Sequence, residues 1–152
     1  MNDRTSQEGR FGVMLVRLAR GWRREADAAL AQTGLSQATA LPLLVLSRLG
    51  DCVRQGMLAE ELGIEGPSLV RLVDLLEGEG HVERREDPSD RRAKTLHITD
   101  KGAAMARQIE TVMGGVRRDI LKDISDADLE ASLRVLARLQ ASLFPADGGR
   151  GA

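Results

Sequence analysis

The chain has 152 residues, and its 22 Lys and Arg nearly balance its 23 Asp and Glu. A chain of this length buries about two-thirds of its unfolded surface, so its core needs no disulfide, and the single Cys52 cannot pair within the chain. A formal net charge of −1 excludes a generally basic nucleic-acid surface. Because no apolar run approaches the roughly 20 residues of a membrane span and no signal region begins the chain, we expect a cytoplasmic protein without a membrane partner.

Two helices are expected before residue 50. Apolar residues recur at helical spacing from Phe11 to Leu30, and Gly34 is expected to end this first helix. Ser36 is a candidate cap for a second helix that runs to Leu49. Pro42 falls inside that second helix and is expected to bend it or split it.

Two shorter helices separated by a turn are expected next. The first spans residues 56–62, and Gly63 supplies the turn. The second spans residues 67–77 and begins with Pro67, whose fixed φ suits a first helical position. Its inner face follows the spacing i, i+3, i+4 and i+7 and consists of Leu69, Leu72, Val73 and Leu76. This order is typical of a helix-turn-helix.

After Gly78 and Gly80 the hydropathy period changes from helical to alternating. Residues 81–85 and 91–99 alternate as strands do, and the Asp-Pro-Ser-Asp segment between them is typical of a turn. The sequence therefore predicts a β-hairpin with a solvent-exposed tip. Two helices followed by a hairpin predict a winged helix-turn-helix lobe over residues 36–99.

The last third of the chain is expected to form two more helices, over residues 101–121 and 126–143. Gly114-Gly115 is a candidate kink in the first, and Ser125 with Asp128 resembles a capping box for the second. With the helix at 11–31, they carry more apolar surface than one small lobe covers. We therefore expect a mainly α, single-domain chain (1–152) of six helices plus a β-hairpin wing, which forms a homodimer through residues 10–33 and 100–144.

Duplex DNA is the partner that this arrangement favours. The outer face of the helix at 67–77 carries Pro67, Ser68 and Arg71, and the planar fork of Arg71 can make two bonds to a guanine edge. The predicted hairpin adds five further candidate DNA contacts: Arg84, Arg85, Arg91, Arg92 and Lys94. Arg91 and Arg92 follow the turn directly and are the first choice for a narrow minor groove. Aromatic residues make up only 2% of the chain, which disfavours a single-strand binder that stacks bases.

Three segments of this lobe resemble the MarR family of bacterial transcription regulators, and within it the SlyA-like branch. They are residues 58–64 (Leu-Ala-Glu-Glu-Leu-Gly-Ile), 67–71 (Pro-Ser-Leu-Val-Arg) and 83–94, which include Asp-Pro-Ser-Asp-Arg-Arg. The resemblance implies an intertwined homodimer that binds a palindromic operator, with Pro67, Ser68 and Arg71 at the major groove and Arg91 in the minor groove. It also implies a repressor that is released or modulated by a small aromatic carboxylate effector.

The resemblance places candidate effector contacts on the first helix. Arg17 and Arg20 lie one turn apart near Trp22, and they align with the SlyA-like segment that faces such a carboxylate. Residues 39–41 read Thr-Ala-Leu where SlyA-like proteins carry His and Trp, which removes a hydrogen-bonding group and an aromatic wall. Alternatively, Trp22 packs in the core or the dimer interface, and the two arginines are solvated.

Two other interpretations stay open at this point. A urate-binding branch of the family would use Trp22, Asp74 and Arg91, but it has an extra N-terminal helix, which the ten residues before Phe11 cannot provide. A winged helix can also bind proteins alone, although exposed arginines disfavour this because interface centres are depleted of charge.

Catalytic and metal sites are not expected. The sequence contains no nucleophile motif, phosphate loop or glycine fingerprint, so it predicts neither an enzyme nor a cofactor. His81 and His97 have no cysteine or histidine at metal-ligand spacing, and Cys52 is interpreted as an unreactive thiol.

Overall fold

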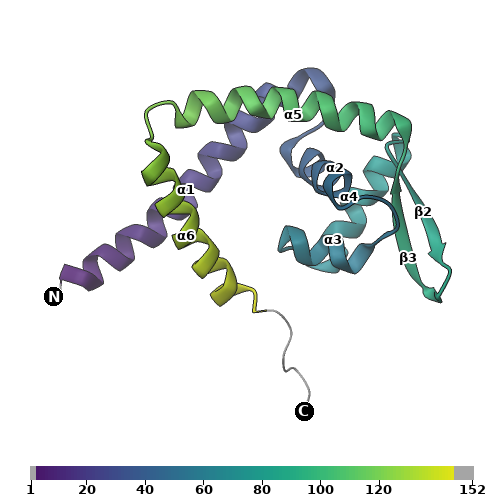
Figure 1. Ribbon diagram of the computed structural model, residues 1–152, viewed down its shortest axis with the longest axis horizontal. Helices are drawn as coiled ribbons and strands as arrows, with labels where there is room; N and C mark the ends of the chain where they lie inside the picture. Colours follow the sequence, from purple (N-terminus) through teal and green to yellow (C-terminus); the bar gives the residue numbers. More distant parts are fainter. Residues whose placement is uncertain (1–2, 146–152) are drawn as a thin grey trace, which may run out of the picture. The chain divides into compact units, whose positions relative to one another are not determined.

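The computed structural model describes residues 3–145, which form six α-helices, a short 3-10 helix and one three-stranded sheet (Figure 1). In chain order these are α1 (Asp3–Leu30), η1 (Ala31–Thr33), α2 (Gln37–Leu49), β1 (Val53–Arg54), α3 (Gln55–Leu62), α4 (Gly66–Gly78), β2 (Val82–Asp87), β3 (Asp90–Ile98), α5 (Asp100–Leu121) and α6 (Asp126–Leu143). The mainly α, winged-helix class is confirmed. The chain divides into two compact units between Val116 and Arg117.

Helix α1 begins at Asp3, eight residues earlier than the apolar pattern predicts. Polar pairs one turn apart stabilise this added segment: Arg4 Nε donates to Glu8 Oε1 over 2.9 Å, and Gln7 Nε2 donates to Asp3 Oδ2 over 3.1 Å. An apolar stripe cannot reveal a turn held by polar side chains, which explains the difference.

Helix α2 is one continuous helix, so the expectation that Pro42 splits it is wrong. Its start is fixed by a capping box, in which Thr39 N donates to Ser36 Oγ and Ser36 N donates to Thr39 Oγ1. Pro42 is the sixth helical residue, and its missing N–H removes only the bond to the Ala38 carbonyl. The buried residues that follow, among them Leu43, keep the rest of the helix in place.

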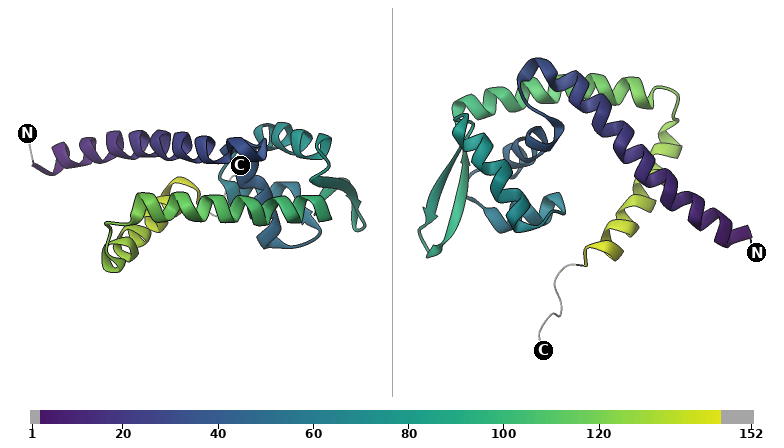
Figure 2. Two further views of the ribbon diagram at one scale, coloured as in Figure 1. Left: turned by 90° about the horizontal axis from the view of Figure 1, so that it is seen from above. Right: turned by 180° about the vertical axis from the view of Figure 1, so that it is seen from behind.

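The core of the winged lobe lies between α2, α3, α4 and the sheet. Leu69, Val73 and Leu76 of α4 are at most 1% exposed, as the helical spacing predicts. The sheet is antiparallel with the order β1-β3-β2, and the β2–β3 hairpin extends away from the helices (Figure 2). Strand β1 was not predicted, because two residues are too few to show an alternating pattern.

The start of α5 packs tightly against the base of the hairpin. Thr99 Oγ1 accepts from Gly102 N over 3.0 Å and donates to the Gly80 carbonyl over 2.7 Å. A Cβ added at Gly102 would overlap the His81 carbonyl oxygen and lie 2.9 Å from Ile98 Cγ1. Only glycine therefore fits this position without a shift of backbone.

Gly102→Ala is expected to lower the free energy of unfolding by about 1–3 kcal/mol, since an overpacked site forces its neighbours apart. Urea denaturation followed by circular dichroism measures the change. Gly56→Ala in α3 is the matched control, because an added Cβ there meets nothing within 4 Å. Equal stability of the two variants would show that the close approach at Gly102 is relieved easily.

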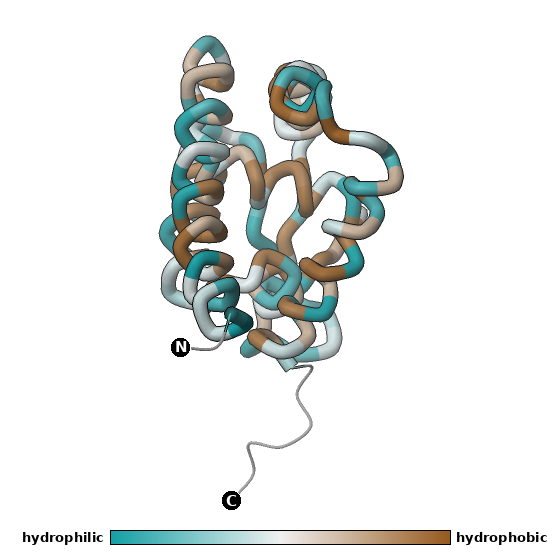
Figure 3. The backbone as a smooth tube through the Cα atoms, turned by 90° about the vertical axis from the view of Figure 1, so that its left-hand side faces the viewer, coloured by the Kyte–Doolittle hydropathy of each residue, from teal (hydrophilic) through white to brown (hydrophobic). Residues whose placement is uncertain are grey.

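Helices α5 and α6 match the expected ranges closely. Helix α5 runs through Gly114-Gly115 without a break, and α6 starts after Ser125, whose Oγ accepts from Asp128 N over 3.2 Å. Apolar and polar residues alternate along the helical turns (Figure 3). Large apolar side chains stay exposed on α1 and α6, including Val13, Val16, Leu18, Leu133, Leu136 and Leu143.

Length and apolar composition decide whether one of the described helices could span a membrane. None of the individual helices combines the length and the apolar composition needed to cross a bilayer. Only the pair Asp3–Thr33 and Gln37–Leu49, which is bent by 79°, meets both criteria together.

Candidate nucleic-acid interface

The outer face of α4 presents an unpaired arginine. Pro67, Ser68 and Arg71 are exposed, whereas Leu69 and Val73 on the opposite face are buried. Within residues 3–145 no hydrogen-bond or ion-pair partner contacts the Arg71 guanidinium. Its five N–H donors are therefore available to an external acceptor.

Arg84, by contrast, is held inside the lobe, with only 19% of its side chain exposed. Its Nη1 lies 2.6 Å from Asp74 Oδ1 and 2.7 Å from Glu77 Oε2. Its Nε donates to Gln55 Oε1 over 3.3 Å, and its Nη2 donates to the Val70 carbonyl over 3.2 Å. Arg84 thus joins β2 to both α3 and α4, and it fixes the wing relative to the outer face of α4.

The other cations of the wing are exposed. Arg85 pairs with Glu83 over 3.0 Å, and Lys94 lies 3.6 Å from Glu86, but exposed pairs of this kind contribute little stability. The guanidinium groups of Arg91 and Arg92, beside the tip, have no partner in the described part of the chain. These two arginines and Arg71 are therefore the cations of the lobe that are free to bind phosphates or bases.

The tip of the wing is built around the carboxylate of Asp87, which lies in the strand β2. Ser89 donates to Asp87 Oδ1 from its hydroxyl over 2.6 Å and from its backbone N over 2.8 Å. Arg54 of β1 donates to Asp87 Oδ2 over 2.8 Å and to Ser89 Oγ over 3.3 Å. Sequence reasoning missed Arg54, because 33 residues separate it from Asp87. The Asp-Pro-Ser turn was the available signal.

These bonds set the protonation of Asp87. The Ser89 hydroxyl, then the Ser89 backbone N–H, and then Arg54 lower the pKa of Asp87 from 3.8 to about 2, while its burial acts in the opposite direction. A carboxyl with a depressed pKa contributes stability that is fully present above pH 3.8 and is lost as the pH falls through about 2.

Asp87→Asn is accordingly expected to remove a pH-dependent part of the free energy of unfolding. The stability difference between wild type and variant should stay constant from pH 7 to about 4 and shrink at lower pH. Urea denaturation across this range measures it, with the exposed neighbour Asp90→Asn as control. If the stability difference from wild type shrank equally for Asp87→Asn and Asp90→Asn as the pH fell, a special role of Asp87 would be contradicted.

The candidate effector residues lie on α1. Arg17 and Arg20 are exposed, and they share a depression of about 710 Å³ with Met14, Leu18, Gly21 and Arg24. Trp22 is half-buried and does not line this depression. The structure thus brings the two arginines together but places the indole away from them.

The remaining candidates are Asp74, Cys52 and the two histidines. Asp74, which a urate site would need, pairs with Arg84. Among the described residues no group of three or more His, Cys, Asp or Glu is arranged to hold a metal ion. Cys52 is exposed, and His81 and His97 are both buried.

The family model described as the MarR family matches residues 33–93. The chain is 41% identical to the transcriptional regulator PA3341, with a TM-score of 0.78, over 88% of this chain and 97% of that chain. The chain belongs to the MarR family.

Two further MarR-like structures share the fold at lower identity. One is the S. aureus MepR–DNA complex, at 20% identity and a TM-score of 0.79, covering 88% of this chain and 97% of that one. The other is CouR from Rhodococcus jostii RHA1 bound to p-coumaroyl-CoA, at 23% identity and a TM-score of 0.77, covering 91% and 95%. The six helices and the wing of this MarR-family chain are thus the fold of its relatives.

Proposed function

We propose that this protein is a transcription regulator that binds duplex DNA, with α4 in the major groove and the tip of the β2–β3 wing in the adjacent minor groove. The observation that carries the proposal is the pattern of free and paired arginines. Arg71 on α4 and Arg91 and Arg92 at the wing tip are exposed and unpaired among the described residues, while Arg84 is bonded inside the lobe and Arg54 is paired with Asp87 at the surface. The MepR–DNA complex, which has the same fold, supports this use of the lobe.

The DNA contacts divide by chemistry. Arg71 reads a base edge, and Pro67 and Ser68 bring the first turn of α4 against the groove. Arg91 and Arg92 enter the minor groove, and the loosely paired Arg85 and Lys94 exchange their acidic partners for phosphates. Arg84 is a positioning residue, since its donors are already used by Asp74, Glu77 and their neighbours.

We also propose that the operator is palindromic and that the protein binds it as a homodimer. The apolar side chains exposed on α1 and α6 need a partner surface, and residues 10–33 and 100–144 would provide it on both subunits. Two lobes one helical turn apart would read a site of roughly 16 to 24 base pairs.

Leu133→Glu is expected to dissociate this dimer, because a carboxylate would replace an apolar side chain that is 57% exposed in the single chain. Sedimentation velocity at micromolar concentration should then give a monomer. The neighbouring charge change Arg134→Glu on α6 is the control and should leave the dimer intact. If the protein stays dimeric in both variants, the dimer interface does not include this face of α6.

The third part of the proposal is regulation by a small aromatic carboxylate that releases a repressor from its operator. Arg17 and Arg20 on α1, which line one depression together, are the proposed cationic contacts. The complex of CouR with p-coumaroyl-CoA supports a ligand-responsive role, since that ligand also joins an aromatic ring to anionic groups.

Salt-dependent DNA binding tests the central proposal. Fluorescence anisotropy should detect tighter binding to DNA from the protein's own upstream region than to random duplex, with affinity falling steeply as salt rises. The double variant Arg91→Ala/Arg92→Ala should flatten the salt dependence, whereas Arg138→Ala, an exposed change on α6, should not. If the upstream DNA and the random duplex bound with the same affinity, and salt did not change it, the alternative of a winged helix that binds only proteins would be favoured.

A further inference from the structure

One row of side chains on the outer face of α4 is left open to an external partner. Ser68, Arg71 and Leu75 follow the spacing i, i+3 and i+7, so they lie along one side of the helix. All three are exposed. Within residues 3–145 neither the Ser68 hydroxyl nor the Arg71 guanidinium has a hydrogen-bond or ion-pair partner. We call these three residues the open row of α4.

The neighbouring row on the same helix is already bonded to the wing. Val70, Asp74 and Glu77 follow the spacing i, i+4 and i+7. The guanidinium of Arg84, on strand β2, bonds to the Val70 carbonyl and to both carboxylates over 2.6 to 3.2 Å. This row therefore faces the wing, and the open row is the part of the outer face that remains for another molecule.

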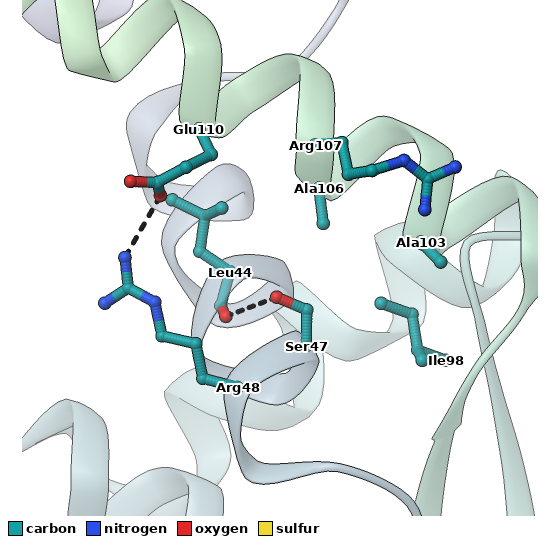
Figure 4. A pocket seen from close by; sticks show the side chains of 8 residues that line it. All are labelled: Leu44, Ser47, Arg48, Ile98, Ala103, Ala106, Arg107 and Glu110. Atoms are coloured by element: carbon teal, nitrogen blue, oxygen red, sulfur yellow. Dashed lines mark hydrogen bonds and ion pairs between the residues drawn. The ribbon is translucent and has the colours of Figure 1, made fainter.

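Leu75 ends the open row and is the most exposed large apolar side chain of the winged lobe, at 56%. Other apolar side chains of the lobe face a neighbouring element. Leu44 and Ile98, for example, line one pocket with Ala103 and Ala106 of α5 (Figure 4). Leu75 is not among the residues that pack on the core. Its exposure one turn after an unpaired arginine fits a partner that presents polar and apolar groups on one surface.

The major groove of duplex DNA presents this combination. Its base edges carry hydrogen-bond donors and acceptors, and its apolar group is the C5-methyl of thymine. Because a helix rises about 1.5 Å per residue, the open row spans about 10 Å, which is the rise of about three base pairs. The four residues from Arg71 to Leu75 correspond to less than two base pairs.

We propose that Leu75 reads a thymine methyl group in each half-site of the operator, within two base pairs of the guanine that Arg71 reads. The inference rests on the proposed function, in which α4 lies in the major groove, and it adds a specificity-determining residue to that function. Leu75 buries its exposed surface best where a methyl group faces it, so an A·T pair with its thymine on that side is favoured.

Replacement of thymine by uracil in the DNA tests the contact, because the two bases differ only by the methyl group. The preferred duplex is first selected from a random pool with the wild-type protein. Each thymine within two base pairs of the position at which Arg71→Ala loses its base preference is then replaced by uracil in both half-sites. In anisotropy titrations one such replacement should weaken binding about fourfold per half-site, as expected for one buried methyl group.

Variants of Leu75 assign this effect to its side chain. Leu75→Asn has a similar size but is polar, so it should bind the thymine duplex about fourfold per half-site more weakly than wild type and should bind the uracil duplex equally well. Leu75→Met stays apolar and should still distinguish the two duplexes. Leu49→Asn, at an exposed apolar position on α2, is the control and should behave as wild type with both.

Three results would overturn the proposal: no thymine within two base pairs whose methyl group matters, a thymine preference that persists in Leu75→Asn, or an equal loss with both duplexes in that variant. The last result would mean that Leu75 only supports the stem of Arg71. If thermal melting shows that Leu75→Asn is unfolded, Leu75→Ala takes its place, because alanine favours a helix. A wild type that selects no sequence would defeat the proposed function together with this inference, whereas sequence selection without a methyl effect would defeat the inference alone.

Discussion

Replacing Arg71 with alanine is expected to weaken operator binding by about 2–6 kcal/mol, since each of two subunits loses a bidentate base contact that contributes about 1–3 kcal/mol. The guanidinium is exposed on α4, and no described residue of the chain depends on it for a hydrogen bond. Its removal should therefore leave the free energy of unfolding unchanged. The effect is confined to DNA binding, which makes Arg71 the most informative single change.

Anisotropy titrations of Arg71→Ala and Arg71→Lys measure this loss, together with selection of preferred sequences from a random pool. The lysine variant keeps the charge but not the planar fork, so it should recover phosphate attraction and still lose base preference at one position per half-site. Arg138→Ala on α6 is the control for removal of an exposed charge. Unchanged affinity and preference in Arg71→Ala would mean that α4 does not read the bases.

Arg84→Met is expected to have the second largest effect, and it acts through the fold. The change leaves the carboxylates of Asp74 and Glu77 one turn apart without their shared cation. It also removes the donor to the Gln55 side chain and the second donor to the Val70 carbonyl, which stays bonded within α4. The side chain is largely but not fully buried, so the free energy of unfolding should fall by about 1–3 kcal/mol. DNA affinity should fall as well, because the wing is no longer fixed to α4.

Urea denaturation of Arg84→Met measures the stability, with the adjacent Arg85→Met as matched control. Arg85 makes one exposed pair with Glu83, so its variant should lose less than about 0.5 kcal/mol. Adding Asp74→Asn and Glu77→Gln to Arg84→Met should restore part of the stability by removing the carboxylate repulsion. A variant of full stability with a flatter salt dependence of DNA binding would instead make Arg84 a direct phosphate contact.

The secondary structure of this protein was largely predictable because its signals are local. The inner face of α4, the Gly63 turn, the Asp-Pro-Ser-Asp tip and the cap at Ser125 each depend on residues within about two helical turns or one hairpin. The exceptions also have local causes. The polar start of α1 lacks an apolar stripe, and β1 is only two residues long. Helix α2 stays continuous because its other backbone hydrogen bonds remain in place around Pro42.

The sequence alone determined the winged lobe and the cluster of cations on its wing, because spacing and turn chemistry are properties of neighbouring residues. Only the tertiary structure decided which of those cations are free. Arg84 and Arg85 are adjacent in sequence, but one is bonded to α4 and the other faces solvent, since successive strand residues point to opposite faces and only one face meets Asp74. The ion pairs Arg54–Asp87 and Arg48–Glu110 join residues 33 and 62 positions apart, and such contacts exist only once the chain has folded.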